Sequence, residues 1–165
     1  MMNRKLLELG EKVGDLLTRH GDTIAVSESS TGGLIAATLL SRAGASAYFL
    51  GGVVVYTKRA RDVLTDISDE DMRGLRSASA PYAQLLARRT LLRFAATLAI
   101  AETGATGPAG NSYGDPPGHS CLCVVGRVEA ARVLRTGQDD RAANMVTFAV
   151  AAMTLLHEAL LRQGG

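Results

Sequence analysis

The segment of residues 50–56 constrains the fold of this chain more than any other. It reads Leu-Gly-Gly-Val-Val-Val-Tyr and contains no charged residue. A strand with one face in water alternates apolar and polar residues, whereas a strand of a parallel sheet that is covered on both faces is apolar throughout. The segment therefore predicts a strand buried on both sides, with helices above and below the sheet.

Helices and strands are expected to alternate along the rest of the chain. Apolar residues at three- and four-residue spacings indicate helices, and short β-type runs between Gly and Pro breaks indicate strands. The predicted helices are 4–20, 33–41, short ones within 57–75, 81–94 and a last one from Asp139 or Asp140 to 162; the other predicted strands are 23–27, 97–101, 120–125 and 131–135. A Gly- and Pro-rich loop is expected over residues 102–118. This order predicts an α/β fold, a three-layer α/β/α sandwich with a mostly parallel or mixed central sheet, as a single domain over residues 1–165.

Composition favours a small-molecule ligand over a macromolecular one. The net charge is only +2, and aromatic residues make up 4% of the chain with no Trp. Such a chain lacks the basic field and the stacking platforms of nucleic-acid-binding proteins, so we expect neither a nucleic acid nor a membrane as partner. Glycines are numerous, at 18, which allows close approach of the backbone to a ligand.

The two cysteines do not suggest a disulfide framework or a metal site. Cys121 and Cys123 are two residues apart in an apolar run, and no second cysteine pair exists to complete a set of metal ligands. Glu8 and Glu11 interrupt any apolar stretch of the signal-peptide kind near the first residue. We therefore expect a cytoplasmic protein that uses no metal and no cofactor.

The first candidate site lies between the predicted strand 23–27 and the helix that follows. Backbone amides at the start of a helix, next to hydroxyls and glycines, form a ready site for phosphate or carboxylate. A turn capped by Ser or Thr is the alternative. The residues in question are Ser29, Ser30, Thr31, Gly32 and Gly33.

The second candidate site is built on Ser46, which is followed within fifteen positions by Tyr56, Lys58 and Arg61. A serine attacks an amide carbonyl when a nearby base takes its proton, and a desolvated lysine or a tyrosine supplies that base where no histidine is available. In the alternative interpretation, Ser46 caps a helix and the basic residues are solvated.

The third candidate site is the start of the loop after strand 97–101, where Thr103, Gly104, Thr106 and Gly107 occur. Loops that leave the carboxyl ends of parallel strands line the ligand crevice of such folds. We therefore expect the loops at 29–33, 45–46 and 103–107 to converge on one pocket. His119 follows Gly118 at a strand start, where a structural role is the more common one.

Three sequence blocks resemble one known family. They are Ser-Glu-Ser-Ser-Thr-Gly-Gly-Leu-Ile-Ala at 27–36, Ala-Ser-Ala-Tyr-Phe-Leu-Gly-Gly-Val-Val-Val-Tyr at 45–56 and Thr-Gly-Ala-Thr-Gly-Pro at 103–108. In order and spacing they are similar to the C-terminal domain family of the competence- and damage-inducible protein CinA, whose stand-alone members include nicotinamide-nucleotide amidases. The resemblance extends from about Leu6 to Leu160.

The resemblance implies a metal-free amidase with a serine nucleophile. Its reaction would convert nicotinamide mononucleotide to nicotinic acid mononucleotide and ammonia. The family's proposed nucleophile falls on Ser46 and its tyrosine on Tyr56, but its lysine falls on Arg61. A guanidinium stays protonated in proteins and does not act as a general base. Lys58, one helical turn earlier, is the candidate replacement.

Other positions also depart from the family pattern. The family's loop lysine falls on Asp115, and a threonine falls on His119. Arg141 matches the family arginine before the last helix if the preceding loop absorbs two extra residues. These departures leave two interpretations, an active amidase or a catalytically weakened paralogue that binds a nucleotide or another partner.

The last predicted helix bears on assembly. It is apolar almost all round from Ala142 to Leu156, so it lies either in the core or partly at a subunit interface. Together with the resemblance, this pattern leads us to expect a homo-oligomer.

Overall fold

A five-stranded sheet with the strand order β2-β1-β3-β4-β5 forms the centre of the computed structural model, which describes residues 2–162. The strands are β1 (Ile24–Glu28), β2 (Phe49–Val54), β3 (Leu98–Ala105), β4 (His119–Gly126) and β5 (Ala130–Arg135). β1 pairs in parallel with both β2 and β3, while β4 is antiparallel to β3 and β5. The sheet is therefore mixed, as predicted. Met1 and residues 163–165, the ends of the predicted domain, lie outside the described residues.

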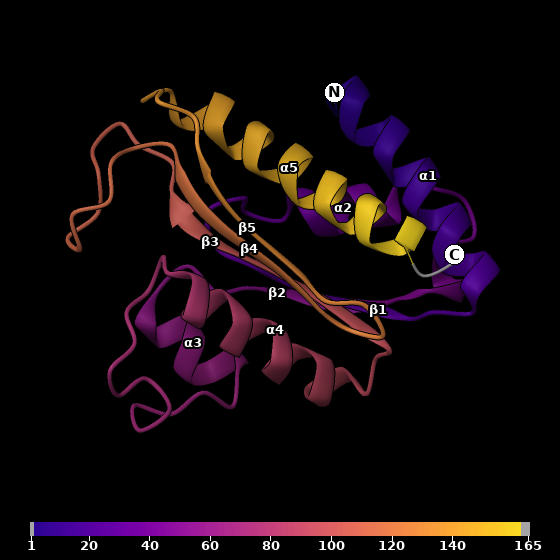
Figure 1. Cartoon of the computed structure of the whole chain (residues 1–165), viewed down its shortest axis with the longest axis horizontal. Coiled ribbons are helices and arrows are strands. Elements are labelled where there is room, and N and C mark those ends of the chain that lie inside the picture. The colour runs from indigo at the N-terminus through magenta and orange to yellow at the C-terminus, as the bar shows by residue number, and fades with distance from the viewer. Residues whose placement is uncertain (1, 163–165) are drawn as a thin grey trace.

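Helices cover both faces of this sheet (Figure 1). They are α1 (Arg4–His20), α2 (Leu34–Leu40), α3 (Lys58–Leu64), α4 (Ala80–Phe94) and α5 (Arg141–Arg162), with a short 3₁₀ turn η1 (Ala45–Ala47) before β2. The helices α1, α2 and α5 lie on one face, and α3 and α4 lie on the other. The predicted α/β fold with three layers is confirmed.

Two apolar clusters hold the layers together. The larger one packs α1, α2 and α5 onto the sheet and includes Leu6, Ile100 and Leu156, each fully buried. The smaller one packs α4 onto the other face around Leu86 and both cysteines. The helix α5 is apolar enough to span a membrane by length and composition, but half of its apolar window is buried in the domain. The expected place in the core is confirmed for the buried half of this helix, and the expected subunit interface stays a prediction.

The strand at residues 50–56 is confirmed, but its predicted burial on both faces is wrong. β2 is an edge strand whose side chains alternate between half-buried and exposed, with Leu50 43% and Val54 42% exposed. One face packs against α4, where a Cβ on Gly51 would lie 2.6 Å from Phe94. On the other face, α2 is only about 10 Å long, whereas a strand of this length extends about 20 Å. Part of β2 is therefore left uncovered.

Truncation of Leu156 to alanine tests the larger cluster. Because Leu156 is a fully buried member of this cluster, Leu156→Ala should lower the free energy of unfolding by about 2–5 kcal/mol, the cost of truncating a buried leucine. Leu161→Ala, in the same helix but 55% exposed, should change it by no more than about 0.5 kcal/mol. Urea unfolding of the three proteins measures both effects. Equal losses in the two variants would contradict this packing.

Candidate active site

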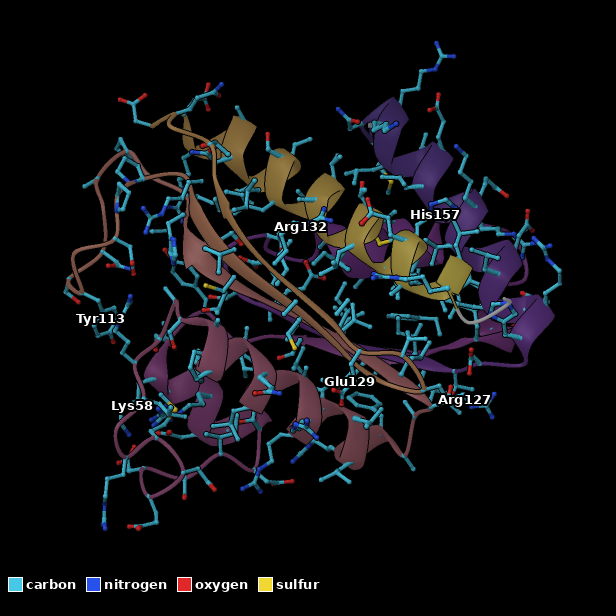
Figure 2. The ribbon with its side chains drawn as sticks, in the orientation of Figure 1. Lys58, Tyr113, Arg127, Glu129, Arg132 and His157 are labelled. Carbon is cyan, nitrogen blue, oxygen red and sulfur yellow. The ribbon has the colours of Figure 1, made fainter. Side chains whose placement is uncertain are left out.

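The carboxyl ends of three parallel strands meet at one edge of the sheet. Because β1 lies between β2 and β3, the segments that follow these strands lie side by side there. A pocket of about 440 Å³ opens among them, lined by Ser29 after β1, by Tyr56 after β2 and by Thr103 in β3. Lys58 and Tyr113 lie at this end of the molecule and Arg127 lies at the opposite end (Figure 2).

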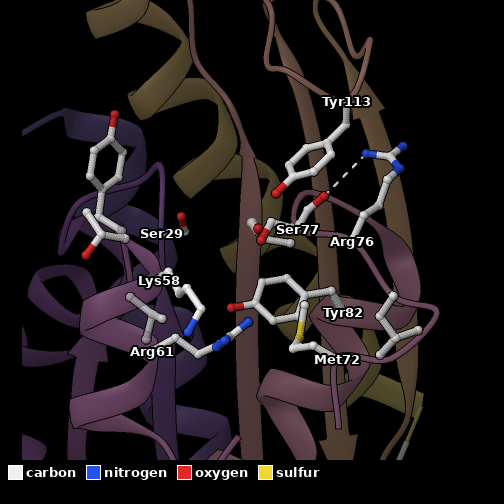
Figure 3. A pocket seen from close by; sticks show the side chains of 13 residues that line it. Ser29, Lys58, Arg61, Met72, Arg76, Ser77, Tyr82 and Tyr113 are labelled. Carbon is white, nitrogen blue, oxygen red and sulfur yellow. Dashed lines mark hydrogen bonds between the residues drawn. The ribbon is translucent and has the colours of Figure 1, made fainter. Parts of the chain in front are cut away.

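Two walls with different chemistry enclose the pocket. Ser29, Lys58 and Arg61 lie on one side, while Ser77 and Tyr113 lie on the other (Figure 3). Apolar and aromatic side chains complete the lining, namely Val55, Met72, Leu75 and Tyr82. A flat, partly apolar ligand with polar groups at its rim fits such a lining.

A second hollow of about 230 Å³ shares Tyr56 with the first. In it, Arg141 Nη1 donates to the carbonyl of Gly107 at 2.9 Å, and Nη2 donates to the Tyr56 hydroxyl at 2.9 Å. The turn at Gly107 has φ +108, and a Cβ there would lie 2.5 Å from the Asp139 carbonyl, so only glycine fits. Ser30, Gly104 and Thr106 also line this hollow. The structure thus brings Thr106, Gly107 and Arg141 to Tyr56.

Two buried glutamates, which the sequence interpretation missed, accept hydrogen bonds from the backbone amides of the 29–33 loop. Glu102 accepts from the Ser29 and Thr31 amides at 3.1 and 2.9 Å. Glu28 accepts from the amides of Gly33, Ile35 and Ala36 at 3.0, 3.0 and 2.7 Å. The available signal was a charged residue at the end of an apolar strand, directly before a loop rich in hydroxyls.

The prediction that the backbone amides of the 29–33 loop bind an anionic ligand is therefore wrong. These amides already bind carboxylates of this chain, so they do not cradle a phosphate. Thr31 is fully buried and, with Gly32 and Gly33, does not line either pocket. Ser29 and Ser30 do reach the ligand space, one in each hollow.

The prediction that the 45–46 loop joins the other two is also wrong. Ser46 lies in η1, before β2 begins, and the neighbouring Tyr48 carbonyl accepts from the amide of Ile24 at the start of β1. Tyr56 follows the other end of β2. A strand of this length separates the two residues by about 20 Å, so the structure does not bring Ser46 to Tyr56, Lys58 or Arg61. Two serines line the pocket with those three residues, Ser29 on the side of Lys58 and Arg61 and Ser77 on the opposite wall (Figure 3).

The basic residues of the pocket are held in ion pairs. Lys58 Nζ lies 2.9 Å from Asp62 and 3.1 Å from Asp69. Arg61, which is buried, lies 3.1 and 2.6 Å from the same two carboxylates. Hydrogen bonds to Asp62 and then to Asp69 raise the pKa of Lys58 above its usual value. The Lys58 amine is therefore protonated, and it is no free base for a serine.

The two remaining departures lie behind the far wall. Both terminal nitrogens of Arg76 donate to the Asp115 carboxylate, Nη2 at 3.0 Å. The guanidinium carbon of Arg76 lies 5.6 Å from the centre of the Tyr113 ring. The pairing with Arg76 lowers the pKa of Asp115 to about 2. His119 is buried, with Nε2 2.8 Å from the Ala78 carbonyl, and lines neither hollow. Asp115, at the position of the family's loop lysine, thus holds Arg76 over the Tyr113 ring.

A metal site has no candidate ligand set in the part of the chain from residue 2 to residue 162. Groups of three or more His, Cys, Asp or Glu side chains that could hold an ion do not occur there.

Asp115→Asn should loosen the far wall. The carboxylate loses its ion pair as pH falls through its folded pKa of about 2, so the stabilisation is complete above the unfolded value of about 3.9. At pH 7 the variant should lose about 1 kcal/mol of unfolding free energy, a modest value because Arg76 is 41% exposed. The difference from wild type should shrink between pH 4 and pH 2 in urea unfolding. The matched change Asp66→Asn, in an exposed pair with Arg93, should have little effect. A deficit as large at pH 2 as at pH 7 would show that the ion pair is not its cause.

Comparison with known proteins gives one consistent family. The model of the CinA C-terminal domain matches residues 6–160. A CinA-like protein of Chlorobium phaeovibrioides is 36% identical over 94% of this chain, and one of Mycobacterium marinum is 40% identical over 72%; the chain spans only 38% and 28% of their lengths.

Solved structures agree over the whole domain. A CinA superfamily protein of Klebsiella pneumoniae superposes with a TM-score of 0.88 at 27% identity, covering 95% of this chain and 98% of that one. A competence/damage-inducible protein of Agrobacterium tumefaciens gives 0.87 at 28% identity, covering 100% and 99%. Since the family model covers nearly the whole chain and a relative is more than one third identical, this chain belongs to the CinA C-terminal domain family.

Proposed function

We propose that this domain is a nicotinamide-nucleotide amidase, which hydrolyses the carboxamide of nicotinamide mononucleotide to a carboxylate and ammonia without a metal. The observation that carries the proposal is the convergence of Ser29, Tyr56 and Arg61 on one pocket at the carboxyl edge of the sheet. Membership of the CinA family supports it. The coarse geometry also supports it, because an apolar and aromatic lining suits a pyridine ring.

Ser29 is the serine that fits the proposed chemistry, in place of Ser46. Its Oγ attacks the carboxamide carbon while a base takes the hydroxyl proton, and ammonia leaves with a proton as the tetrahedral intermediate collapses. Water then hydrolyses the acyl ester and restores the hydroxyl. The Ser29 amide is held by Glu102 at 3.1 Å, which keeps this residue at the pocket wall.

The charge distribution orients the proposed substrate. Lys58, Arg61 and Arg76 all face carboxylates, whereas Arg141 has no carboxylate partner among the described residues. Arg141 therefore offers the positive charge that a nucleotide phosphate prefers. With the phosphate at Arg141, the carboxamide extends past Tyr56 towards Ser29.

A second candidate function is nucleotide binding with little or no turnover. The ion pairs of Lys58 and Arg61 with Asp62 and Asp69 favour it. Neither side chain offers an unprotonated nitrogen beside Ser29, and general-base assistance contributes about 10²–10⁴-fold to rate. Saturable binding of nicotinamide mononucleotide, without ammonia release above the background of Ser29→Ala, would establish this alternative.

Two serine variants separate the candidate nucleophiles. Ser29→Ala should reduce ammonia release from nicotinamide mononucleotide by about 10³-fold or more, while its backbone amide still donates to Glu102. Ser46→Ala, at the opposite sheet edge, should leave the rate within about twofold. Steady-state ammonia assays, with a thermal melt to confirm folding, measure both. The reverse result would assign the nucleophile to Ser46 and require a second copy of the chain to bring it to the pocket.

Substitution of Arg61 tests the base. A lysine buried at that position sheds its proton more readily than a guanidinium, but Asp69 would still hold it in an ion pair. Arg61→Lys combined with Asp69→Asn should therefore raise amidase activity, within about 10²–10⁴-fold. If Lys58 is already the base, Arg61→Lys should change little and Lys58→Met should abolish turnover. A measurable wild-type rate that neither change alters would remove both residues from the mechanism.

The proposal includes self-association and a cytoplasmic location. Leu40, Leu50 and Val54 are exposed apolar side chains on α2 and the β2 edge, at 54%, 43% and 42%. An edge strand next to exposed apolar residues is suited to pairing with a second copy. Light scattering at micromolar concentration decides between a monomer and an assembly.

A further inference from the structure

The carboxyl groups of Glu28 and Glu102 are buried together without a cation. They are 1% and 0% exposed and come from the neighbouring strands β1 and β3, on the face covered by α2 and α5. Desolvation by burial raises the pKa of Glu28, and backbone and hydroxyl hydrogen bonds oppose that rise only in part. Two carboxylates that share a site do not readily ionise together.

The hydroxyl of Thr31 lies between the two groups. Its Oγ1 is 2.7 Å from Glu28 Oε2 and 2.9 Å from Glu102 Oε2. A hydroxyl has one proton, so it donates to only one of two acceptors. The other oxygen–oxygen contact is a hydrogen bond only if the carboxyl group supplies the proton. Both contacts of Thr31 Oγ1 are hydrogen bonds when one carboxyl of the pair is protonated.

Other groups around the pair supply donors but no charge. Glu102 also accepts from the Ser30 and Ser120 hydroxyls, and these contacts hold its oxygens in addition to the two loop amides. Besides Thr31 Oγ1, two amides and two hydroxyls face Glu102, and three amides face Glu28. Because burial raises the pKa of Glu28, we expect Glu28 to hold the proton.

No cation from the surrounding elements reaches the pair within residues 2–162. Helix α2 has no ionisable residue, and the buried face of α1 consists of Leu, Val and Gly. At the start of α5, the guanidinium of Arg141 donates to the Gly107 carbonyl and the Tyr56 hydroxyl instead of the pair. On β4, the ionisable Cys121 and Cys123 lie in the cluster on the other face, where burial raises the pKa of Cys121 to about 11. His119 contacts Cys121 on that same face. The nearest β2 residue in register with Glu28 is Val54.

We propose that Glu28 and Glu102 share one proton through the Thr31 hydroxyl at neutral pH, and that this proton-sharing pair positions Ser29 in the pocket. The chain of contacts runs from Glu28 through Thr31 to Glu102, and from Glu102 to the Ser29 amide. Loss of the proton at high pH places two negative charges beside one hydroxyl, and the loop that carries Ser29 shifts in response. Glu28 and Glu102 are thus positioning residues. The inference stands whether or not the domain is an amidase.

A carboxyl titration measures the proton directly. The experiment follows the ¹³C carboxyl signals of labelled glutamate and the amide signals of Ser29 and Thr31 by NMR from pH 4 to pH 9. One carboxyl of the pair should titrate well above the usual value of about 4.3, and the two amide signals should move with the same midpoint. Ionisation of every glutamate in the usual range, or amide signals that ignore the high midpoint, would overturn the proposal.

The variant Glu102→Gln separates a shared proton from simple burial. Its amide oxygen still accepts from Ser29 and Thr31, and its NH₂ group faces the hydroxyls of Ser30 and Ser120, which accept as well as donate. The second charge is gone, so the Glu28 midpoint should fall. The control Glu129→Gln changes a 61% exposed side chain away from the pocket (Figure 2) and should leave the midpoint in place. A Glu28 midpoint that stays unchanged in Glu102→Gln would overturn the sharing.

Unfolding equilibria give a second measure that needs no ligand. A carboxyl with a raised folded pKa makes the wild-type unfolding constant rise by up to about tenfold per pH unit, from about pH 4.3 to the folded midpoint. In Glu102→Gln this rise should end at a lower pH than in wild type. If that variant does not fold, the wild-type titration alone decides the proposal.

Discussion

The parallel pairing of β1 with both of its neighbours determines where this domain can bind a ligand. It places the chain after Glu28, after Val54 and around Thr103 at one edge of the sheet, although these segments are far apart in sequence. The same constraint removes Ser46 from the site, because a residue that precedes β2 lies at the opposite edge. Position relative to strand direction thus decides which hydroxyl is available to a substrate.

Most of the fold could be predicted because its signals are local. The spacing of Leu6, Leu9, Val13 and Leu17 marks α1, and Gly21 ends it in a left-handed cap. Strand neighbours are not a local property. Nothing within residues 49–54 shows that β2 lies at the edge, since its apolar character is compatible with a central strand. The order β2-β1-β3 arises from pairing of β1 with segments about 25 and about 74 residues further along the chain.

The site was less predictable for the same reason. The contacts that organise it join Ser29 to Glu102 and Arg76 to Asp115 across 73 and 39 residues. Sequence blocks identified the right loops after β1 and β3, but they could not show that the loop amides bind internal carboxylates. The sequence also left Lys58 as a candidate base, but Asp69, eleven residues later, folds back to form an ion pair with it.

Two carboxylate systems of opposite character flank the proposed ligand space. Asp62 and Asp69 face cations at the solvent edge, and Lys58 lowers the pKa of Asp62, so this group stays ionised and neutralises the pocket wall. Glu28 and Glu102 face only neutral donors, where ionisation of both is unfavourable. Neither system leaves net positive charge near Ser29. Electrostatic attraction for an anionic ligand is therefore concentrated at Arg141, and Ser29 is surrounded by groups suited to a neutral one. A substrate with a charged end and an uncharged polar end matches this division, as a nucleotide carboxamide does.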